Sequence, residues 1–383
     1  IAQGAQALYS NTTGNDNMAI GKRALYSNTT GGNNIAQGLR ALYSNTTGND
    51  NIAQGLEALH SNTTGSNNIA QGLRALYSNT TGRNNIVQGY QALYNNTAGS
   101  NNIAQGYQAL YNNTAGYSNI AQGPGALRTN TTGNYNIAQG EFTLYKNTTG
   151  NGNIAIGLEV LYNNTTGGNN IAQGYQALRT NTTGSNNIVQ GYQALQANTT
   201  GGNNIAQGSR TLFFNTTGSY NITQGVEALQ ANTTGSYNIA QGYQALQANT
   251  TGSYNIAMGM SSGKWIKGNA NIHIGVDANS ISNVSGELNH VIAIGHFDSG
   301  GGLYSLNTTT TNDNVILLGN ASPTAPKVGV GTYKPQAKLD VAGAVRVAND
   351  TSACTSANEG AIRYVSASKK FQGCDGTSWV NLN

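Results

Sequence analysis

The residues with the clearest potential for chemistry are the asparagines of a repeated Asn-Thr-Thr triplet, which is an acceptor sequence for N-linked sugar. The triplet recurs at a 17-residue interval, and where Ala98 and Ala115 replace its second threonine a sequon starts one residue earlier. We therefore predict candidate glycosylation sites at Asn11, Asn28, Asn45, Asn62, Asn79, Asn95, Asn112, Asn130, Asn147, Asn164, Asn181, Asn198, Asn215, Asn232 and Asn249.

The same triplet has a purely structural interpretation. Asparagine and the glycine that follows the threonines favour turns, and β-branched threonines suit stacked ladders. The threonine hydroxyls are also candidate acceptors for O-linked sugar. Both interpretations place the triplet in a loop at the surface of the protein.

The two cysteines, Cys354 and Cys374, lie close to the end of the sequence. Their spacing suits neither a CxxC redox motif nor a four-ligand zinc site, which leaves a disulfide or two free thiols. We predict the disulfide.

No set of residues predicts catalysis or metal binding. The four histidines have no paired metal-ligand spacing, and the Gly-Asn-Asp-Asn segments at 14–17 and 48–51 are typical of turns. No nucleophile, base and orienting group can be assembled. We therefore expect a protein that is not an enzyme and that needs no cofactor.

Composition limits the class of protein further. Charged residues make up 8% of the 383 residues, 51 residues are glycine, and the net charge is +4. This charge forms no basic cluster, so we expect no nucleic-acid partner. The sequence contains no apolar run long enough for a transmembrane helix, so we expect no membrane span.

The element that must position the triplets is a tandem repeat. Ile-Ala-Gln-Gly or a close variant returns at a 17-residue interval from Ile1 to Ile256, and (256 − 1)/17 gives fifteen complete repeats. We number the positions of each repeat 1 to 17 from Ile1. Two helices within one repeat would be too short to be stable, whereas extended chain folded back at the glycines makes one coil of a solenoid. We predict an all-β fold, a parallel β-solenoid of 17-residue coils.

Substitutions between repeats suggest which side chains face inward. Ile20, Ile156 and Met258 replace glutamine at position 3. Exchange with large apolar residues predicts that position 3 is a buried amide ladder, in the coil or at a subunit junction, with Ile1 on the same face and Leu8 as a second buried anchor. The ladder includes Gln3, Gln37, Gln54, Gln71, Gln88 and Gln105. Positions 5, 6, 10 and 15 vary freely and are expected outside.

One Ile, one Leu and a few Ala per coil bury little apolar surface, so we expect the chain to form a homo-oligomer. Segments 17–21, 153–157 and 291–295 resemble the head repeats of YadA-like trimeric adhesins, and Gly89-Tyr90-Gln91-Ala92-Leu93 is similar to repeats of phage tail fibres. The resemblance covers residues 1 to about 259, with weaker matches to about 319. It implies a left-handed parallel β-roll, a trimer, and a location outside the cell or on a cell or virion surface.

We divide the chain into a repeat rod (1–259), a cap or neck of degenerate repeats (260–325) and a small C-terminal β module (326–383). The rod predicts a structural subunit of an extracellular fibre or polymeric filament, and the sequons predict covalent glycans on it. The alternative is an adhesin or tail-fibre protein that binds a cell-surface receptor or glycan through its C-terminal region.

Overall fold

The computed structural model describes residues 1–278, 291–294, 315–318, 328–330, 339–341, 353–356, 361–365 and 369–382. It divides the chain into two units, Ile1–Leu318 and Gly319–Asn383.

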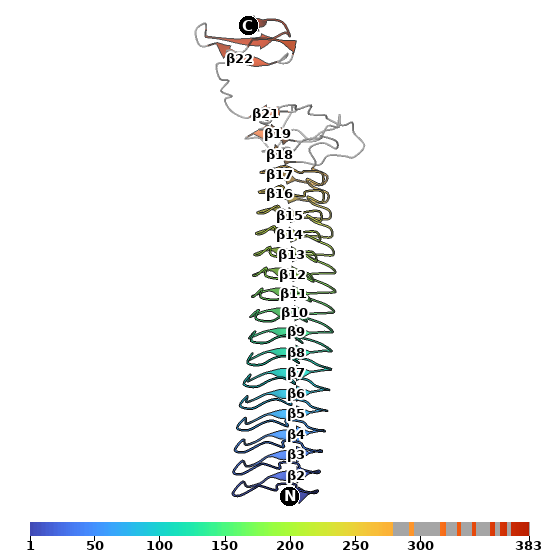
Figure 1. Ribbon diagram of the computed structural model, residues 1–383. Helices are drawn as coiled ribbons and strands as arrows, with labels where there is room; N and C mark the ends of the chain where they lie inside the picture. The colour runs from blue at the N-terminus through green and yellow to red at the C-terminus, as the bar shows by residue number, and fades with distance from the viewer. Residues whose placement is uncertain are drawn as a thin grey trace. The chain divides into compact units, whose positions relative to one another are not determined.

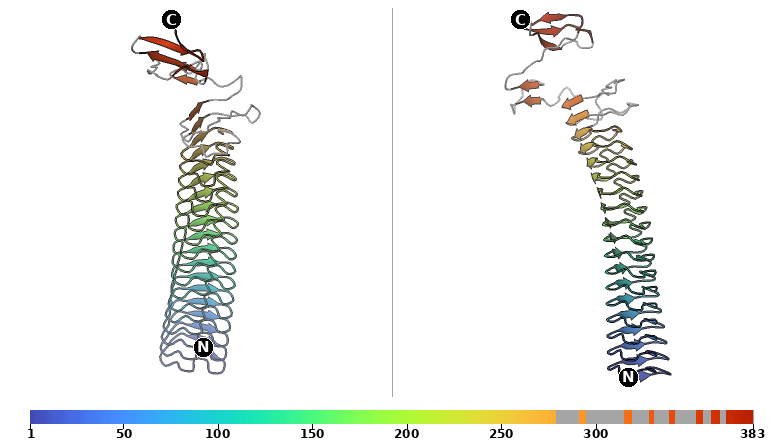
Figure 2. Two further views of the ribbon diagram at one scale, coloured as in Figure 1. Left: turned by 45° about the horizontal axis from the view of Figure 1, so that its top comes forward. Right: turned by 60° about the vertical axis from the view of Figure 1, so that its left-hand side comes forward.

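The first unit is a parallel β-solenoid, in which successive coils stack along one axis (Figure 1). Each regular coil contributes one short strand, and 19 strands form a single parallel sheet. The stack of coils curves gently along its length (Figure 2). The strands are β1 (Ala2–Gln3), β2 (Met18–Ile20), β3 (Ile35–Gln37), β4 (Ile52–Gln54), β5 (Ile69–Gln71), β6 (Ile86–Gln88), β7 (Ile103–Gln105), β8 (Ile120–Gln122), β9 (Ile137–Gln139), β10 (Ile154–Ile156), β11 (Ile171–Gln173), β12 (Ile188–Gln190), β13 (Ile205–Gln207), β14 (Ile222–Gln224), β15 (Ile239–Gln241), β16 (Ile256–Met258), β17 (Ile272–Ile274), β18 (Val291–Ile294) and β19 (Val315–Leu318).

The register places each residue beside its equivalents in the two neighbouring coils. Ile154 of β10 pairs with Ile137 on one side and with Ile171 on the other. Backbone hydrogen bonds also join neighbouring coils outside the strands, as from the Leu127 N–H to the Thr143 carbonyl at 3.0 Å. The predicted 17-residue β-solenoid is therefore confirmed.

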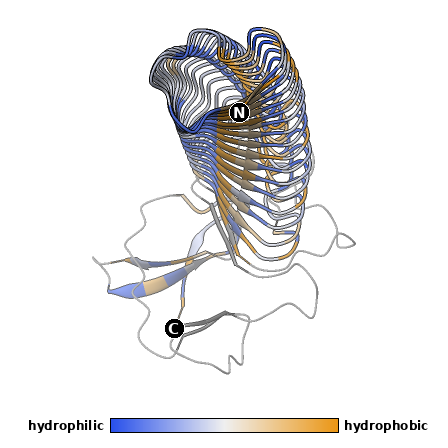
Figure 3. Cartoon of the chain, turned by 90° about the horizontal axis from the view of Figure 1, so that it is seen from below, coloured by the Kyte–Doolittle hydropathy of each residue, from blue (hydrophilic) through white to orange (hydrophobic). Residues whose placement is uncertain are grey.

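The core of the solenoid is a narrow apolar column. It is filled by small residues at positions 2 and 7, mostly alanine, and by leucine at position 8. From the second coil on, these side chains are fully buried. Figure 3 shows the coils along this axis, with hydrophobic colour concentrated along the strands. The prediction that position 8 is a buried anchor is confirmed.

Two interiors were open for the Gln and Ile of positions 3 and 1; the structure excludes the interior of the coil, and a subunit junction remains untested. Position 2 faces inward, so strand alternation turns positions 1 and 3 outward. Gln3, Gln37 and Gln88 are exposed, and Gln54, Gln71 and Gln105 are partly exposed. Coils this narrow accept Ala, Val or Thr at position 2, and leave no room for a second large side chain beside leucine.

Glycine at position 4 ends each strand in a conformation that other residues avoid. Gly140 has φ +129°, and a Cβ there would lie 2.3 Å from the carbonyl oxygen of Gly157 in the next coil. Leucine at position 8 also has positive φ, as in Leu144 at +52°. Such a conformation is unfavourable for leucine, so its burial must compensate for the strain.

The regular spacing ends after β16. Ile256 of β16 pairs with Ile272 of β17, one residue short of the regular interval. The next two pairs, Ile272 with Ile292 and Ile292 with Ile316, are separated by wider intervals. The sheet thus passes the predicted boundary at 259 and extends to the end of β19, while residues 279–290, 295–314 and 319–325 of the predicted cap lie outside the described residues.

A buried histidine near this end predicts a dependence on pH. His273 occupies the inward position 2 of β17, and its Nδ1 lies 2.7 Å from the Ala278 carbonyl oxygen. Burial lowers the pKa of the imidazole below its ordinary value of 6.5. The unfolded state therefore binds the proton more readily, so stability is complete above about pH 6.5 and falls as the pH drops below that value.

We expect amide exchange in residues 256–278 to quicken between pH 7.5 and pH 5 beyond its intrinsic dependence on pH, with a slope of at most about 1.4 kcal/mol per pH unit. His273→Ala, which introduces the residue found at position 2 of most coils, should flatten this response. His60→Tyr should leave it unchanged in this segment. An equal response in His273→Ala would show that another group titrates there.

The second unit contains two small sheets. Strands β20 (Val328–Val330) and β21 (Leu339–Val341) pair in parallel, and β22 (Ile362–Val365), β23 (Lys370–Cys374) and β24 (Trp379–Asn381) form an antiparallel sheet. A disulfide joins Cys354 to Cys374, as predicted. A turn precedes β24, where the Asp375 carboxylate accepts hydrogen bonds from the N–H groups of Thr377 and Ser378.

Reduction of this disulfide should loosen the C-terminal sheet selectively. The cross-link joins residues 20 apart, for which loss of loop-closure constraint costs about 3 kcal/mol. We expect amide protection in β22 to β24 to fall under reducing conditions, while protection in β2 to β16 stays the same. Unchanged protection in β22 to β24 would show that packing alone holds the sheet.

Candidate assembly surface

Two ladders of asparagine run inside the solenoid and determine which loop residues remain outside. At position 11, the Asn147 Nδ2 donates to Asn130 Oδ1 at 2.8 Å and to the Gly150 carbonyl at 3.0 Å. At position 17, the Asn136 Nδ2 donates to Asn119 Oδ1 at 3.1 Å and also to the Gly150 carbonyl, at 2.9 Å. The carbonyl of this position-14 glycine thus accepts from both ladders.

These ladders correct the prediction that the triplet asparagines accept N-linked sugar. Most are fully buried, and both Nδ2 hydrogens point to partners within the chain, so the folded coil has no room for a glycan there. The buried candidates are Asn28, Asn45, Asn62, Asn79, Asn130, Asn147, Asn164, Asn181, Asn198, Asn215, Asn232 and Asn249. Asn11, Asn95 and Asn112 are partly exposed, and for them the prediction remains untested.

The first threonine of each triplet forms a third ladder, at position 12. Its hydroxyl donates to the backbone carbonyl of the matching threonine in the next coil, as from Thr131 to Thr148 at 3.0 Å and from Thr148 to Thr165 at 3.0 Å. The structural interpretation of the triplet, as a turn with a threonine ladder, is therefore confirmed.

The outer face of the strands carries two rows of side chains, mostly isoleucine at position 1 and mostly glutamine at position 3. Ile188 and Ile222 are 42% and 39% exposed, which is a large exposure for aliphatic side chains. The glutamines bond along the row, as from Gln71 to Gln54 at 2.8 Å and from Gln88 to Gln71 at 2.9 Å. Each such amide uses only part of its bonding capacity within the row.

A third row at position 5, just beyond the strand, is mostly apolar and exposed. Its members include Leu39, Tyr90, Tyr107, Leu158, Tyr192 and Tyr243. Position 5 lies outside, as predicted, but its apolar character sets it apart from an ordinary solvated position. We call positions 1, 3 and 5 together the assembly face.

Elsewhere the coils are tied together by stacked rings at position 9. Seven rings, from Tyr9 through His60 to Tyr111, stack at centroid distances of 4.9–5.2 Å. The Arg128 guanidinium continues the column and lies 5.4 Å from the Tyr111 ring and 5.7 Å from the Tyr145 ring. Ring stacking and cation–π contacts thus add to the cohesion of the rod.

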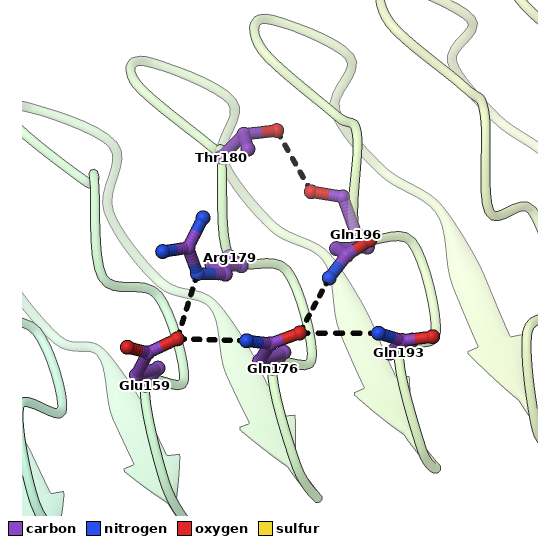
Figure 4. A network of polar contacts seen from close by, with 6 residues as sticks. All are labelled: Glu159, Gln176, Arg179, Thr180, Gln193 and Gln196. Atoms are coloured by element: carbon purple, nitrogen blue, oxygen red, sulfur yellow. Dashed lines mark hydrogen bonds and ion pairs between the residues drawn. The ribbon is translucent and has the colours of Figure 1, made fainter.

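Where arginine and glutamine replace these rings, a polar network joins the coils instead (Figure 4). Glu159 accepts from Gln176 at 2.8 Å and from Arg179 at 2.9 Å, and the side-chain Oε1 of Gln176 accepts from Gln196 at 2.8 Å. The hydrogen bond from Gln176, followed by the contact with Arg179, lowers the pKa of the Glu159 carboxyl. These hydrogen bonds join side chains of successive coils and so hold the coils together.

The part of the chain that the structure describes contains no group of three or more His, Cys, Asp or Glu residues arranged to hold a metal ion. Among the same residues, no helix is long and apolar enough to cross a membrane. The class of protein that the fold defines is a parallel β-solenoid repeat protein. Comparison with protein-family models and with curated proteins finds no match.

Proposed function

We propose that the chain is a structural subunit of an extracellular fibre or filament that assembles with copies of itself through the assembly face. The observation that carries the proposal is the long run of outward-facing isoleucine and glutamine along the strands. Association would remove the isoleucine and position-5 side chains from water and give the glutamines further partners. The resemblance to trimeric adhesin heads favours three chains side by side.

Two further features support this proposal. The low charge of the chain, 8%, limits repulsion between copies packed side by side. The disulfide between Cys354 and Cys374 is typical of proteins outside the reducing cytosol. The disulfide fits a location outside the cell or on a cell or virion surface.

The oligomeric state tests the proposal. Sedimentation of the purified chain should give a mass near 119 kDa, three times the 39.7 kDa chain, or a larger species if trimers join into filaments. A single species of 39.7 kDa across the micromolar range would contradict self-assembly through this face.

A second candidate function, receptor or glycan binding at the C-terminal end, is favoured by a separate observation. One face of the β22 to β24 sheet exposes apolar side chains, with Ile362 57% exposed and Val380 50% exposed on its two outer strands. On the other face the Arg363 guanidinium lies 4.1 Å from the centre of the Trp379 ring. A glycan-array signal that is lost in Trp379→Ala would support this function.

A further inference from the structure

The second threonine of the triplet, at position 13, differs from the first in what its hydroxyl does. The position-12 hydroxyl donates to the next coil, as from Thr80 to the Thr97 carbonyl at 2.9 Å. The position-13 side chain, such as Thr81, is exposed, and its hydroxyl makes no hydrogen bond within the described residues. This holds for Thr13, Thr30, Thr47, Thr64, Thr81, Thr132, Thr149, Thr166, Thr183, Thr200, Thr217, Thr234 and Thr251.

The residue type at position 13 nevertheless hardly varies between coils. The outward positions vary widely: position 10 holds Ser, Lys or Phe in different coils, and position 15 holds Gly, Arg or Tyr. Position 13 holds threonine in every complete repeat except two, where Ala98 and Ala115 stand. Alanine in these two coils shows that the backbone does not require a β-branched residue there. We therefore attribute the recurrence of threonine at position 13 to an external partner or enzyme that uses its free hydroxyl.

We propose that the position-13 threonines are acceptors of O-linked sugar, so that the rod carries a row of neutral glycans along one edge. In the transfer, Thr Oγ1 attacks the anomeric carbon of a nucleoside-diphosphate sugar held by a glycosyltransferase. The new C–O bond forms as the bond to the diphosphate breaks, the hydroxyl proton goes to a base of the transferase, and the nucleoside diphosphate leaves with the electron pair.

The spacing and charge of the rod favour a sugar over a phosphate. Hydroxyls on adjacent coils of a parallel stack lie about 4.8 Å apart. Phosphates of about −1.5 to −2 charge at that spacing would repel one another strongly, and no position of the repeat is basic in most coils, so the charge would not be balanced. Neutral sugars avoid this repulsion and supply the hydration that a surface with few charges lacks.

The proposal does not depend on self-assembly, and its test is separate. Chain purified from the organism that produces it is digested and sequenced by mass spectrometry, with fragmentation that retains sugars. We expect O-linked hexose or N-acetylhexosamine on position 13, none on position 12, and no O-linked sugar on the coils with Ala98 and Ala115, which act as internal controls. Bare threonine at position 13, or sugar spread equally over both threonines, would overturn the proposal.

Variants made in the same organism complete the test. Thr81→Ala should remove the sugar of that coil, Thr81→Ser should keep it, and Thr80→Ala should leave the sugar on Thr81. Thr81→Ala removes no side-chain hydrogen bond within the described residues, so it should fold like the native chain. Loss of the sugar on Thr81 in Thr80→Ala, with the coil still protected from amide exchange, would contradict position 13 as an independent acceptor.

Discussion

A Gly150→Ala substitution is expected to open the rod locally and to destabilise the affected coils by about 3 kcal/mol or more. The added Cβ would lie 2.4 Å from Asn147 Oδ1 and 2.5 Å from the Gly167 carbonyl oxygen. Neither atom can move aside without breaking an asparagine ladder. The buried amide groups that lose their partners then add their desolvation cost to the steric clash.

The structure offers a matched control for this variant. Gly32 occupies the next position of its repeat, where a Cβ would lie 3.3 Å from the nearest atom, the Asn15 carbonyl oxygen. Other coils carry Ser, Asn or Arg there. Hydrogen exchange should show faster opening of residues 137–167 in Gly150→Ala and native protection in Gly32→Ala. Equal protection in both variants would mean that the ladders do not hold the coil together.

The double substitution Ile188→Lys and Ile222→Lys is expected to abolish self-association while leaving each chain folded. Both side chains are outside the core, so lysine can extend into water in the isolated chain. In an assembly, each ammonium group would be buried against isoleucine side chains of a neighbouring copy. It would also be repelled by the lysines that the neighbouring copy carries. We expect the dissociation constant to rise by at least about 100-fold, from a loss of about 3 kcal/mol.

Thr200→Lys with Thr234→Lys is the control, because it adds the same charge to the same two coils at the exposed position 13. Sedimentation of both variants, with circular dichroism to check the fold, makes the comparison. If both variants stay associated, copies meet on another surface, and if both dissociate, net charge alone is responsible.

Much of the fold follows from the 17-residue period, because a strict interval with two glycines per repeat allows few architectures other than stacked coils. Leu8 and its equivalents were also predictable, since leucine at position 8 never varies over the complete repeats. Position 2 also indicates the interior. It accepts only small or β-branched residues over the regular coils, as a narrow interior requires.

The exposure of the glutamines and the burial of the asparagines can both be related to the pattern of substitutions. Exchange of glutamine with Ile20 or Met258 indicated an apolar environment, but one chain cannot show whether that environment is its own interior or the surface of a partner. Sequons usually lie in solvated loops, and on that basis the sequence predicts exposed asparagines. Their lack of substitution at positions 11 and 17 is typical of buried polar residues with fixed partners, whereas the exposed positions 10 and 15 vary between repeats.

Imaging of the native material by electron microscopy, with an antibody to the rod segment, tests the central claim most directly. The account predicts continuous filaments that bind antibody along their whole length, with the solenoid axes of neighbouring chains parallel to the filament axis. Antibody confined to the tip of a larger particle, or bound only to isolated single rods, would contradict a structural subunit that assembles through its strand face.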